Sequence, residues 1–386
     1  MTAQDDVVVA GVGETDYSRS SKRSPDLLAA QAILASCRDA GIDPRHIDGI
    51  VGYPHQTSPE EIVSMFGLPG VTFSPTLHMG GASAVASLGS AAHAIRAGAA
   101  SCVLVYRARN GASGARVGTR ASHLPAQHLR TQLEHPYGLN TPAQRYAMIC
   151  RRYMHEHGLT RRQLGHVALA MRAWAQLNPN ALMHGKPLTM DDYLAGRMIA
   201  DPYTLFDCSP ETDGACAVIV TTADRVGGRD VAARVSAVAE GRPCAPDDLT
   251  SRPDLLAIGL DEAARRAWDA SSLGPQDMDA AMIYDCFTFE LLHQLESAGF
   301  AKEGEAGAFV EREGIGPGGA LPVNTHGGLL SEGHLVGLNH VVEAVRQLRG
   351  ECGERQVADA RRIAVTGWGD LGDGSIGVLE RIEVNR

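Results

Sequence analysis

The strongest constraint on the fold is an internal repeat, because the two halves of this 386-residue chain carry similar patterns in the same order. The segment 76–109 has a counterpart at 324–369. In both, a histidine and a Gly-Gly pair precede a helical pattern that ends in glycine, and a buried strand pattern follows. Upstream of each, "IDGIVGYP" at 47–54 matches "MDAAMIYDCF" at 278–287. The repeat predicts two α/β halves of similar plan.

Strands and helices alternate along the first half. Strands are expected at 7–10, 47–51 and 101–106, and helices at 25–41, from 59 onward and at 80–98. The first helix has a clear start, with Ser24 as the N-cap and Pro25 in the first turn. This alternation predicts a parallel or mostly parallel sheet with helices on its faces.

The middle of the chain, at about 110–205, breaks the repeat. It contains arginine clusters and helical patterns, so we expect a mainly helical insertion whose loops supply a pocket wall. Strand character returns at 215–222. The predicted organisation is therefore an N-terminal half at 1–225, which includes the insertion, and a C-terminal half at 226–386.

Charge and composition limit the classes of function. The formal net charge is −10, which argues against non-specific binding to nucleic acid or to anionic membranes. No stretch reaches the roughly 18 apolar residues of a membrane span, and the acidic start does not resemble a signal peptide. The eight cysteines are scattered without a C-x-x-C motif, so reduced thiols in the cytoplasm are expected.

Four segments and a glycine-rich tail together resemble the thiolase superfamily. They are "HMGGASAVASL" (78–88), "DCSPETDGACAVIV" (207–220), "YDCFTFE" (284–290), "NTHGGLLSEGHLVGL" (324–338) and "VTGWGDLGDGSIGVLE" (365–380). The resemblance is to the lipid-transfer or sterol-carrier thiolase-like branch, and it spans nearly the whole chain. It implies the thiolase fold, a five-layered αβαβα sandwich made of two duplicated halves, here with a mainly helical insertion.

The chain departs from working thiolases at both of their cysteines. Gly81 stands where the family has its nucleophile, and the loop at 366–369 has no thiol. An acyl-enzyme needs a thiolate, which a helix N-terminus stabilises, and glycine cannot attack a carbonyl. Acyl transfer through a covalent intermediate at this position is therefore excluded. The main-chain N–H groups at Gly81 remain able to hold a developing oxyanion. The loop at Gly367 either supplies a second group of such donors or is only a tight β-turn.

An oxyanion site with proton-moving groups but no nucleophile suits retro-aldol cleavage of a β-hydroxyacyl-CoA. The chain resembles the steroid side-chain-cleaving aldolases that act with a partner of the DUF35 type, which has an OB-fold. In those aldolases two tyrosines move the protons. Their positions correspond here to Tyr284 and to His334, and which is the acid and which the base stays open.

The resemblance also implies the assembly. We expect a homodimer bound to the DUF35-type protein, which forms a heterotetramer, with the CoA thioester as substrate and without a cofactor. Two other functions stay open: a catalytically silent scaffold that binds lipids or acyl-CoA, and an acyl transferase that uses an external thiol.

Three further residues are candidates for supporting roles. Asp285 can orient a neighbouring group or serve as a turn residue, and His78 and His326 precede the Gly-Gly pairs at equivalent places in the two halves. Cys286 is expected to be a buried neutral thiol. No metal is predicted; His155 and His157, for example, would point about 200° apart on a helix.

Overall fold

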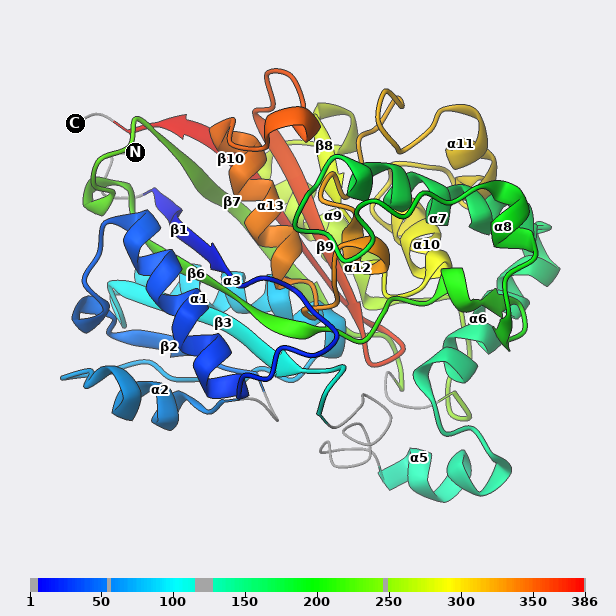
Figure 1. Cartoon of the computed structure of the whole chain (residues 1–386), viewed down its shortest axis with the longest axis horizontal. Helices are drawn as coiled ribbons and strands as arrows, with labels where there is room; N and C mark the ends of the chain where they lie inside the picture. The colour runs from blue at the N-terminus through cyan, green and yellow to red at the C-terminus, as the bar shows by residue number, and fades with distance from the viewer. Residues whose placement is uncertain (1–5, 54–56, 115–127, 246–248, 385–386) are drawn as a thin grey trace.

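The computed structural model describes residues 6–53, 57–114, 128–245 and 249–384, and within them eight strands form one large sheet. The strand order is β2-β3-β6-β1-β7-β10-β9-β8 (Figure 1). The strands are β1 (Val7–Glu14), β2 (Gly49–Val51), β3 (Cys102–Asn110), β6 (Asp213–Thr222), β7 (Val231–Gly241), β8 (Ala280–Met282), β9 (Arg362–Gly369) and β10 (Asp373–Glu383).

The sheet consists of the same arrangement twice, as the repeat predicts. Within the first half the pairs are β2–β3 parallel, β3–β6 antiparallel and β6–β1 antiparallel. In the second half β8–β9 is parallel, and β9–β10 and β10–β7 are antiparallel. The two halves join where β1 pairs with β7 through Val8 and Val9. The duplicated halves of the fold are thereby confirmed.

The prediction of a mostly parallel sheet is wrong, because only the outermost pair of each half is parallel. The short connection at 370–372 shows the reason in the second half. Strands β9 and β10 are joined by a turn too short for the crossover that parallel neighbours require.

Helices form three layers around and between the two half-sheets. Helix α1 (Pro25–Ala40), with α2 (Pro59–Phe66) beside it, packs against the outer face of the first half. Helices α3 (Ser83–Arg96) and α13 (Leu338–Arg349) contact strands of both halves, and α9 (Gly259–Ser271) covers the outer face of the second with α10 (Thr288–Ser297). This is the predicted αβαβα sandwich.

Strand β1 shows how the sequence produces these layers. Val7 and Val9 belong to the core shared with α3 and α13, whereas Val8 and Ala10 belong to the core under α1. Successive side chains of a strand point to opposite faces, so a continuous apolar run is required when both faces are covered by helices.

The segment between β3 and β6 is mainly helical, as expected. It comprises α5 (His128–Leu133), α6 (Pro142–His157), α7 (Arg161–Gln176), α8 (Met190–Leu194) and the small hairpin of β4 (Met198–Ala200) and β5 (Tyr203–Thr204). Helix α7 contacts α10, α11 (Ala306–Arg312) and α12 (Gly328–Ser331) of the second half. The insertion therefore lies on the side of the molecule away from α1 and α2 (Figure 1). The boundary at 225/226 stays a prediction.

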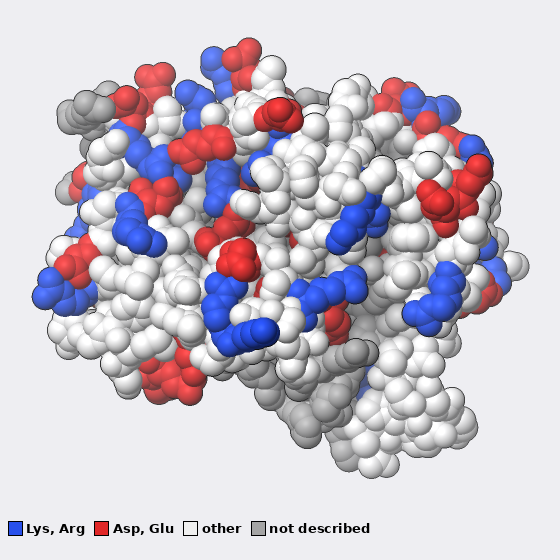
Figure 2. Space-filling view, viewed as in Figure 1, with Lys and Arg blue, Asp and Glu red and all other residues white. Residues whose placement is uncertain are grey.

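No helix in the described part of the chain is long and apolar enough to cross a bilayer. Acidic and basic side chains are interspersed on the face shown in Figure 2. That face has no large area of a single charge sign.

Candidate active site

The structure brings Tyr284 and His334 together from separate parts of the second half. Tyr284 follows β8, and His334 lies in the loop between α12 and α13. The Tyr284 hydroxyl is 3.3 Å from Nε2 of His334, and the two rings are nearly perpendicular. A phenol and an imidazole in this arrangement can exchange a proton.

Ser209, from the connection before β6, orients the imidazole of His334. Its Oγ lies 2.9 Å from Nδ1 of His334, and its main-chain N–H donates to the carbonyl of Cys286. The second ring nitrogen of a histidine is often held in this way, which fixes what the first can do. Ser209 was not predicted from the sequence, where its only signal is its place in the motif at 207–220.

Gly81 lies directly against the ring of Tyr284. It belongs to the short helical turn Gly80–Ala82 that leads into α3. An ideal Cβ at Gly81 would lie 2.2 Å from Cζ of Tyr284 and 2.4 Å from the carbonyl oxygen of Trp368. The tyrosine ring therefore fills the space that the side chain of a nucleophile would need at this position.

Gly367 is close to Gly81 but is not part of a loop, so the prediction of a loop at this position is wrong, whereas its role as an oxyanion donor stays a prediction. It lies inside β9, opposite Ser375 of β10, because the tight turn of this hairpin comes only after Gly369. An ideal Cβ at Gly367 would lie 2.7 Å from Cα of Ala82. The absence of a side chain at Gly367 lets β9 approach the start of α3. In the described part of the chain, the N–H of Gly81 donates no hydrogen bond.

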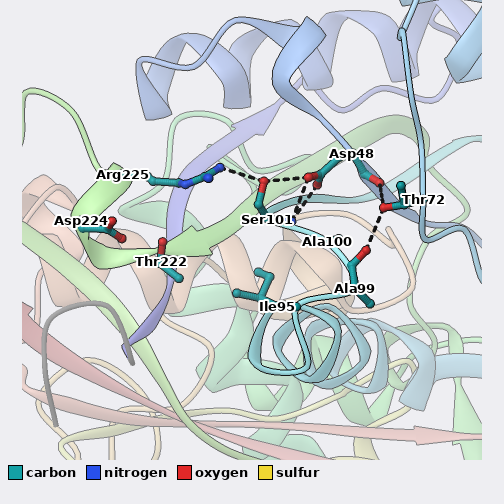
Figure 3. Close-up of a pocket in the computed structure, with 10 residues that line it drawn as sticks. Asp48, Thr72, Ile95, Ala99, Ala100, Ser101, Thr222, Asp224 and Arg225 are labelled. Carbon is teal, nitrogen blue, oxygen red and sulfur yellow. Dashed lines mark hydrogen bonds between the residues drawn. The ribbon is translucent and has the colours of Figure 1, made fainter.

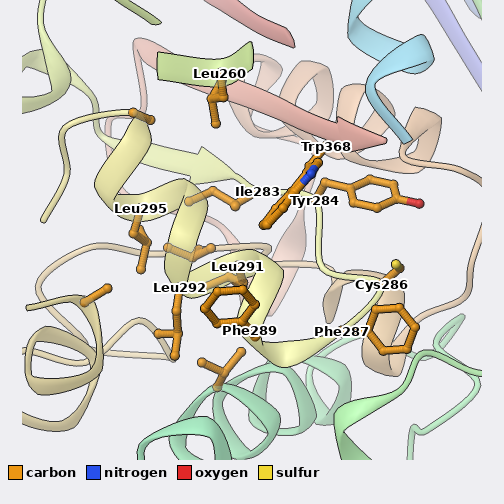
Figure 4. Packing of buried hydrophobic residues seen from close by; sticks show 14 of the residues in the cluster. Leu260, Ile283, Tyr284, Cys286, Phe287, Phe289, Leu291, Leu292, Leu295 and Trp368 are labelled. Atoms are coloured by element: carbon orange, nitrogen blue, oxygen red, sulfur yellow. The ribbon is translucent and has the colours of Figure 1, made fainter. Parts of the chain in front are cut away.

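One side of the Tyr284 ring packs against apolar residues. Trp368 lies beside the ring, and the hydroxyl of Tyr284 points away from the leucines of α10 (Figure 4). Burial, followed by the charges of Cys286 and Glu290, raises the pKa of the Tyr284 phenol well above its ordinary value. Tyr284 is therefore neutral in the resting protein.

Asp285 anchors α12, which precedes the loop that carries His334. Its carboxylate accepts the N–H groups of Leu329 at 2.7 Å and Leu330 at 3.3 Å. Burial raises the pKa of Asp285, although His340 and these N–H groups partly offset the effect. Asp285 thus fixes a loop of the site and lies in its supporting structure.

His326 is also brought into this supporting structure. Its Nε2 lies 2.9 Å from Nδ1 of His340, whose Nε2 lies 3.3 Å from Oδ1 of Asp285. Burial lowers the pKa of His326 well below its ordinary value, which keeps the imidazole neutral. His340 was missed, because its place inside the helical pattern of 338–349 gives no sign of this contact.

His78 does not join the Tyr284–His334 pair. It is half-buried, and its carbonyl accepts a hydrogen bond from Arg242. The described residues also contain no group of three His, Cys, Asp or Glu side chains that could hold a metal.

A hollow of about 470 Å³ lies beside the start of β3 and contains none of the predicted site residues (Figure 3). Of its two acidic groups, Asp48 and Asp224, Asp48 accepts hydrogen bonds from the N–H and hydroxyl of Ser101 and from the N–H of Cys102, which stabilise the turn before β3. The Tyr284–His334 pair lies outside this hollow, so the hollow is not the candidate active site.

Comparisons with known proteins agree with this geometry. Residues 241–379 match the family described as thiolase C-terminal domain-like. A 17-hydroxy-3-oxo-4-pregnene-20-carboxyl-CoA lyase of Mycobacterium tuberculosis is 42% identical over 93% of this chain and 95% of that protein. A steroid side-chain-cleaving aldolase of Thermomonospora curvata is 37% identical over 93% of this chain and 94% of that protein. A solved structure, described as Ltp2-ChsH2(DUF35) aldolase, superposes with a TM-score of 0.91 at 35% identity, covering 97% of this chain and 98% of that one.

Fold and site define a thiolase-fold enzyme that cleaves a carbon–carbon bond without a cysteine nucleophile, a lyase of the retro-aldol type. The site itself combines a closed space above Gly81 with the Tyr284–His334 pair. Within the thiolase superfamily, the chain belongs to the family of steroid side-chain-cleaving aldolases.

Proposed function

We propose that this enzyme cleaves the side chain of a steroid, or of a similarly bulky molecule, carried as a β-hydroxyacyl-CoA. The products are a ketone or aldehyde and a shortened acyl-CoA. The names of the two relatives support the substrate class, since one is a carboxyl-CoA lyase and the other a steroid side-chain-cleaving aldolase. The observation that carries the mechanism is the ring of Tyr284 in the space above Gly81.

The reaction begins at the β-hydroxyl group. We assign Tyr284 as the base, because its hydroxyl can receive the substrate proton while it passes its own proton on. As the O–H bond breaks, the oxygen forms the new carbonyl and the Cα–Cβ bond breaks, which leaves the CoA enolate. The N–H of Gly81, at the start of α3, can donate to the enolate oxygen.

His334 completes the reaction as the acid. Its Nε2 faces the same point as the Tyr284 hydroxyl, and Ser209 holds the other ring nitrogen. A proton from His334 to the α-carbon converts the enolate into the acyl-CoA product. No electrons are gained or lost overall, so the proposed reaction needs no cofactor besides the CoA carried by the substrate.

We also propose a homodimer that binds a DUF35-type partner. The solved relative has DUF35 in its name, which supports the partner. The edge of the first half-sheet supports the dimer: segment 71–77 bonds to β2 on one side through pairs such as Ile50–Phe73. The N–H groups of Ser74 and Thr76 form no hydrogen bond within the described residues. Such an edge can pair with a second copy. The eight free cysteines fit the cytoplasm as the proposed compartment.

The test is the variant Tyr284→Phe in the enzyme co-expressed with its DUF35-type partner. We expect ketone release from a β-hydroxyacyl-CoA to fall on the order of 100-fold or more, with folding retained, because the ring stays and only the hydroxyl is lost. Mass detection of the ketone and the short acyl-CoA measures the change.

Tyr203→Phe is the matched control, since Tyr203 is a fully buried tyrosine whose hydroxyl makes one long bond of 3.4 Å to a carbonyl. Full turnover in Tyr284→Phe would overturn the assignment. A wild-type complex that binds the acyl-CoA without any cleavage would instead support the scaffold function.

A further inference from the structure

A second pair of ionisable groups lies next to Tyr284. The thiol of Cys286 donates a hydrogen bond of 2.8 Å to Oε2 of Glu290, the third residue of α10. Burial raises the pKa of the Cys286 thiol, the charge of Glu290 raises it further, and a hydrogen bond from Tyr284 lowers it. The hydroxyl of Tyr284 and the sulfur of Cys286 lie on the same side of the cluster in Figure 4, so Tyr284, Cys286 and Glu290 form a row of groups that can exchange protons, beginning at the proposed base.

The carboxyl of Glu290 is fully buried. Its Oε1 is also buried, and Tyr146 of α6 is the hydrogen-bonding side chain that acts on the carboxyl besides Cys286. Burying a carboxyl is costly for stability.

Capping of α10 does not account for this cost. Oε2 of Glu290 accepts the N–H of Phe287 at 3.3 Å, which is a helix-capping contact. A neutral glutamine would supply the same acceptor without a group that ionises. The thiol contact and the burial of an ionisable carboxyl therefore need another explanation.

Given the proposed function, on which this inference rests, we propose that Glu290 is a positioning residue that acts through Cys286 as the final acceptor of the proton from Tyr284. As Tyr284 takes the proton of the β-hydroxyl, its own proton moves to Sγ of Cys286. The S–H proton moves in turn to Oε2 of Glu290. One O–H bond breaks at the substrate and one forms at the carboxyl, so the transfer is balanced.

The cycle closes without another reactant. His334 has given a proton to the α-carbon, and its Nε2 lies 3.3 Å from the Tyr284 hydroxyl. The proton held on Glu290 returns through Cys286 and Tyr284 to His334. The relay thus explains how a buried phenol, which resists ionisation, acts as a base.

The surroundings of Glu290 determine the pH at which it can accept a proton. The groups that act on it are Tyr146 from α6, the N–H of Phe287 before α10, and Asp285 and Cys286 from the loop after β8. Burial is the largest influence and raises the pKa of Glu290 to about 8. Below that pH the carboxyl is mostly protonated and cannot accept another proton, so turnover should rise with pH up to about 8.

The experiment measures kcat/KM of the co-expressed complex from pH 6 to 9.5. In Glu290→Gln we expect a loss on the order of 100-fold at pH 8 and no rise with pH, since the amide cannot ionise. Cys286→Ala should show the same loss, because it interrupts the relay while Glu290 remains. Cys286→Ser should recover turnover and the pH dependence, because a hydroxyl can also accept and donate.

Cys208→Ala is the matched control: it removes another inward-facing thiol, one that contacts the carbonyl of Thr204. Unchanged turnover and an unchanged pH profile in Glu290→Gln or Cys286→Ala would overturn the relay. If Glu290→Gln does not fold, the contrast between Cys286→Ala and Cys286→Ser decides. A defect in Tyr284→Phe with normal Glu290→Gln removes only the relay, whereas normal Tyr284→Phe removes the proposed function itself.

Discussion

At the scale of single residues, the site depends on the pairing of a glycine with an aromatic ring. Gly81 has room for a hydrogen atom only, because Tyr284 and the carbonyl of Trp368 occupy the position of a Cβ. The ring then places a hydroxyl beside His334. The missing nucleophile at Gly81 and the position of the Tyr284 hydroxyl beside His334 therefore both result from packing one aromatic ring against one glycine.

Restoring a cysteine at residue 81 should therefore not restore thiolase chemistry. We expect Gly81→Cys to lower lyase turnover on the order of 100-fold, since Tyr284 must move. Overpacking should also lower the free energy of unfolding by about 1–3 kcal/mol. Steady-state kinetics and chemical denaturation measure the two effects, and the intact-protein mass should show no acyl adduct.

Gly81→Ala should be equally damaging, because the clash begins at Cβ. In the double variant Gly81→Cys with Tyr284→Ala the ring is removed, but the carbonyl oxygen of Trp368, 2.4 Å from the ideal Cβ, still occupies the space, so we expect no acyl adduct there either. Normal turnover in Gly81→Ala would contradict this account.

At the scale of elements, the loop after β8 connects the site to α12. Asp285 bonds to two main-chain N–H groups of α12 and approaches His340 of α13. The φ of Gly328 is +64°, and its ideal Cβ would lie 2.0 Å from Oδ2 of Asp285. The aspartate therefore fits only against a glycine at the start of this helix, and it sets the position of the loop that carries His334.

Asp285→Ala should destabilise both the fold and the site. The change leaves two buried N–H groups without partners, so we expect a loss of roughly 3 kcal/mol in the free energy of unfolding. Turnover should fall as well, because the loop with His334 is no longer anchored. Chemical denaturation and kinetics measure these effects.

Asp279→Ala provides the comparison. Asp279 also accepts two main-chain N–H groups, those of Arg361 and Arg362, but it is exposed. Its loss should cost about 1 kcal/mol and leave turnover unchanged. Equal effects of the two variants would argue against a role of Asp285 in placing His334.

Sequence patterns predict the start and end of a helix correctly where contacts between neighbouring residues determine them. Ser24 accepts the N–H of Leu27 at the start of α1, and Gly41 ends that helix with a φ of 67°, as the pattern indicates. Strand direction was predicted incorrectly, because it depends on connection lengths and on the path of the insertion. The partners Ser209 and His340 were missed because each meets its histidine only through the tertiary fold.

At the scale of the whole molecule, the repeat in the sequence corresponds to two similar structural halves that both contribute to the proposed site. Both halves provide a Gly-Gly pair before a helix, but the halves use it differently. The first half places Gly81 under the tyrosine ring, and the second supplies Tyr284 and His334. The family resemblance identified this division, whereas the repeat alone could not show which half keeps the chemistry.

The proposed dimer depends on the free edge at 71–77. Ser74→Pro removes an N–H from that edge and should shift the protein from dimer to monomer, because proline cannot donate to a ladder. Ser74→Ala keeps the N–H and should remain dimeric. Analytical ultracentrifugation distinguishes the two. A dimeric Ser74→Pro variant would show that the copies meet elsewhere.

The fit between Gly81 and Tyr284 also restricts how this enzyme can evolve. A mutation that brings back sulfur meets an aromatic obstacle, and a mutation that removes the obstacle first discards the proposed base. Under the proposed function, each of these single substitutions therefore gives an inactive enzyme. Evolution between an enzyme that forms an acyl-enzyme and this lyase therefore requires both codons to change together, or a duplicated gene that is free of selection in the meantime.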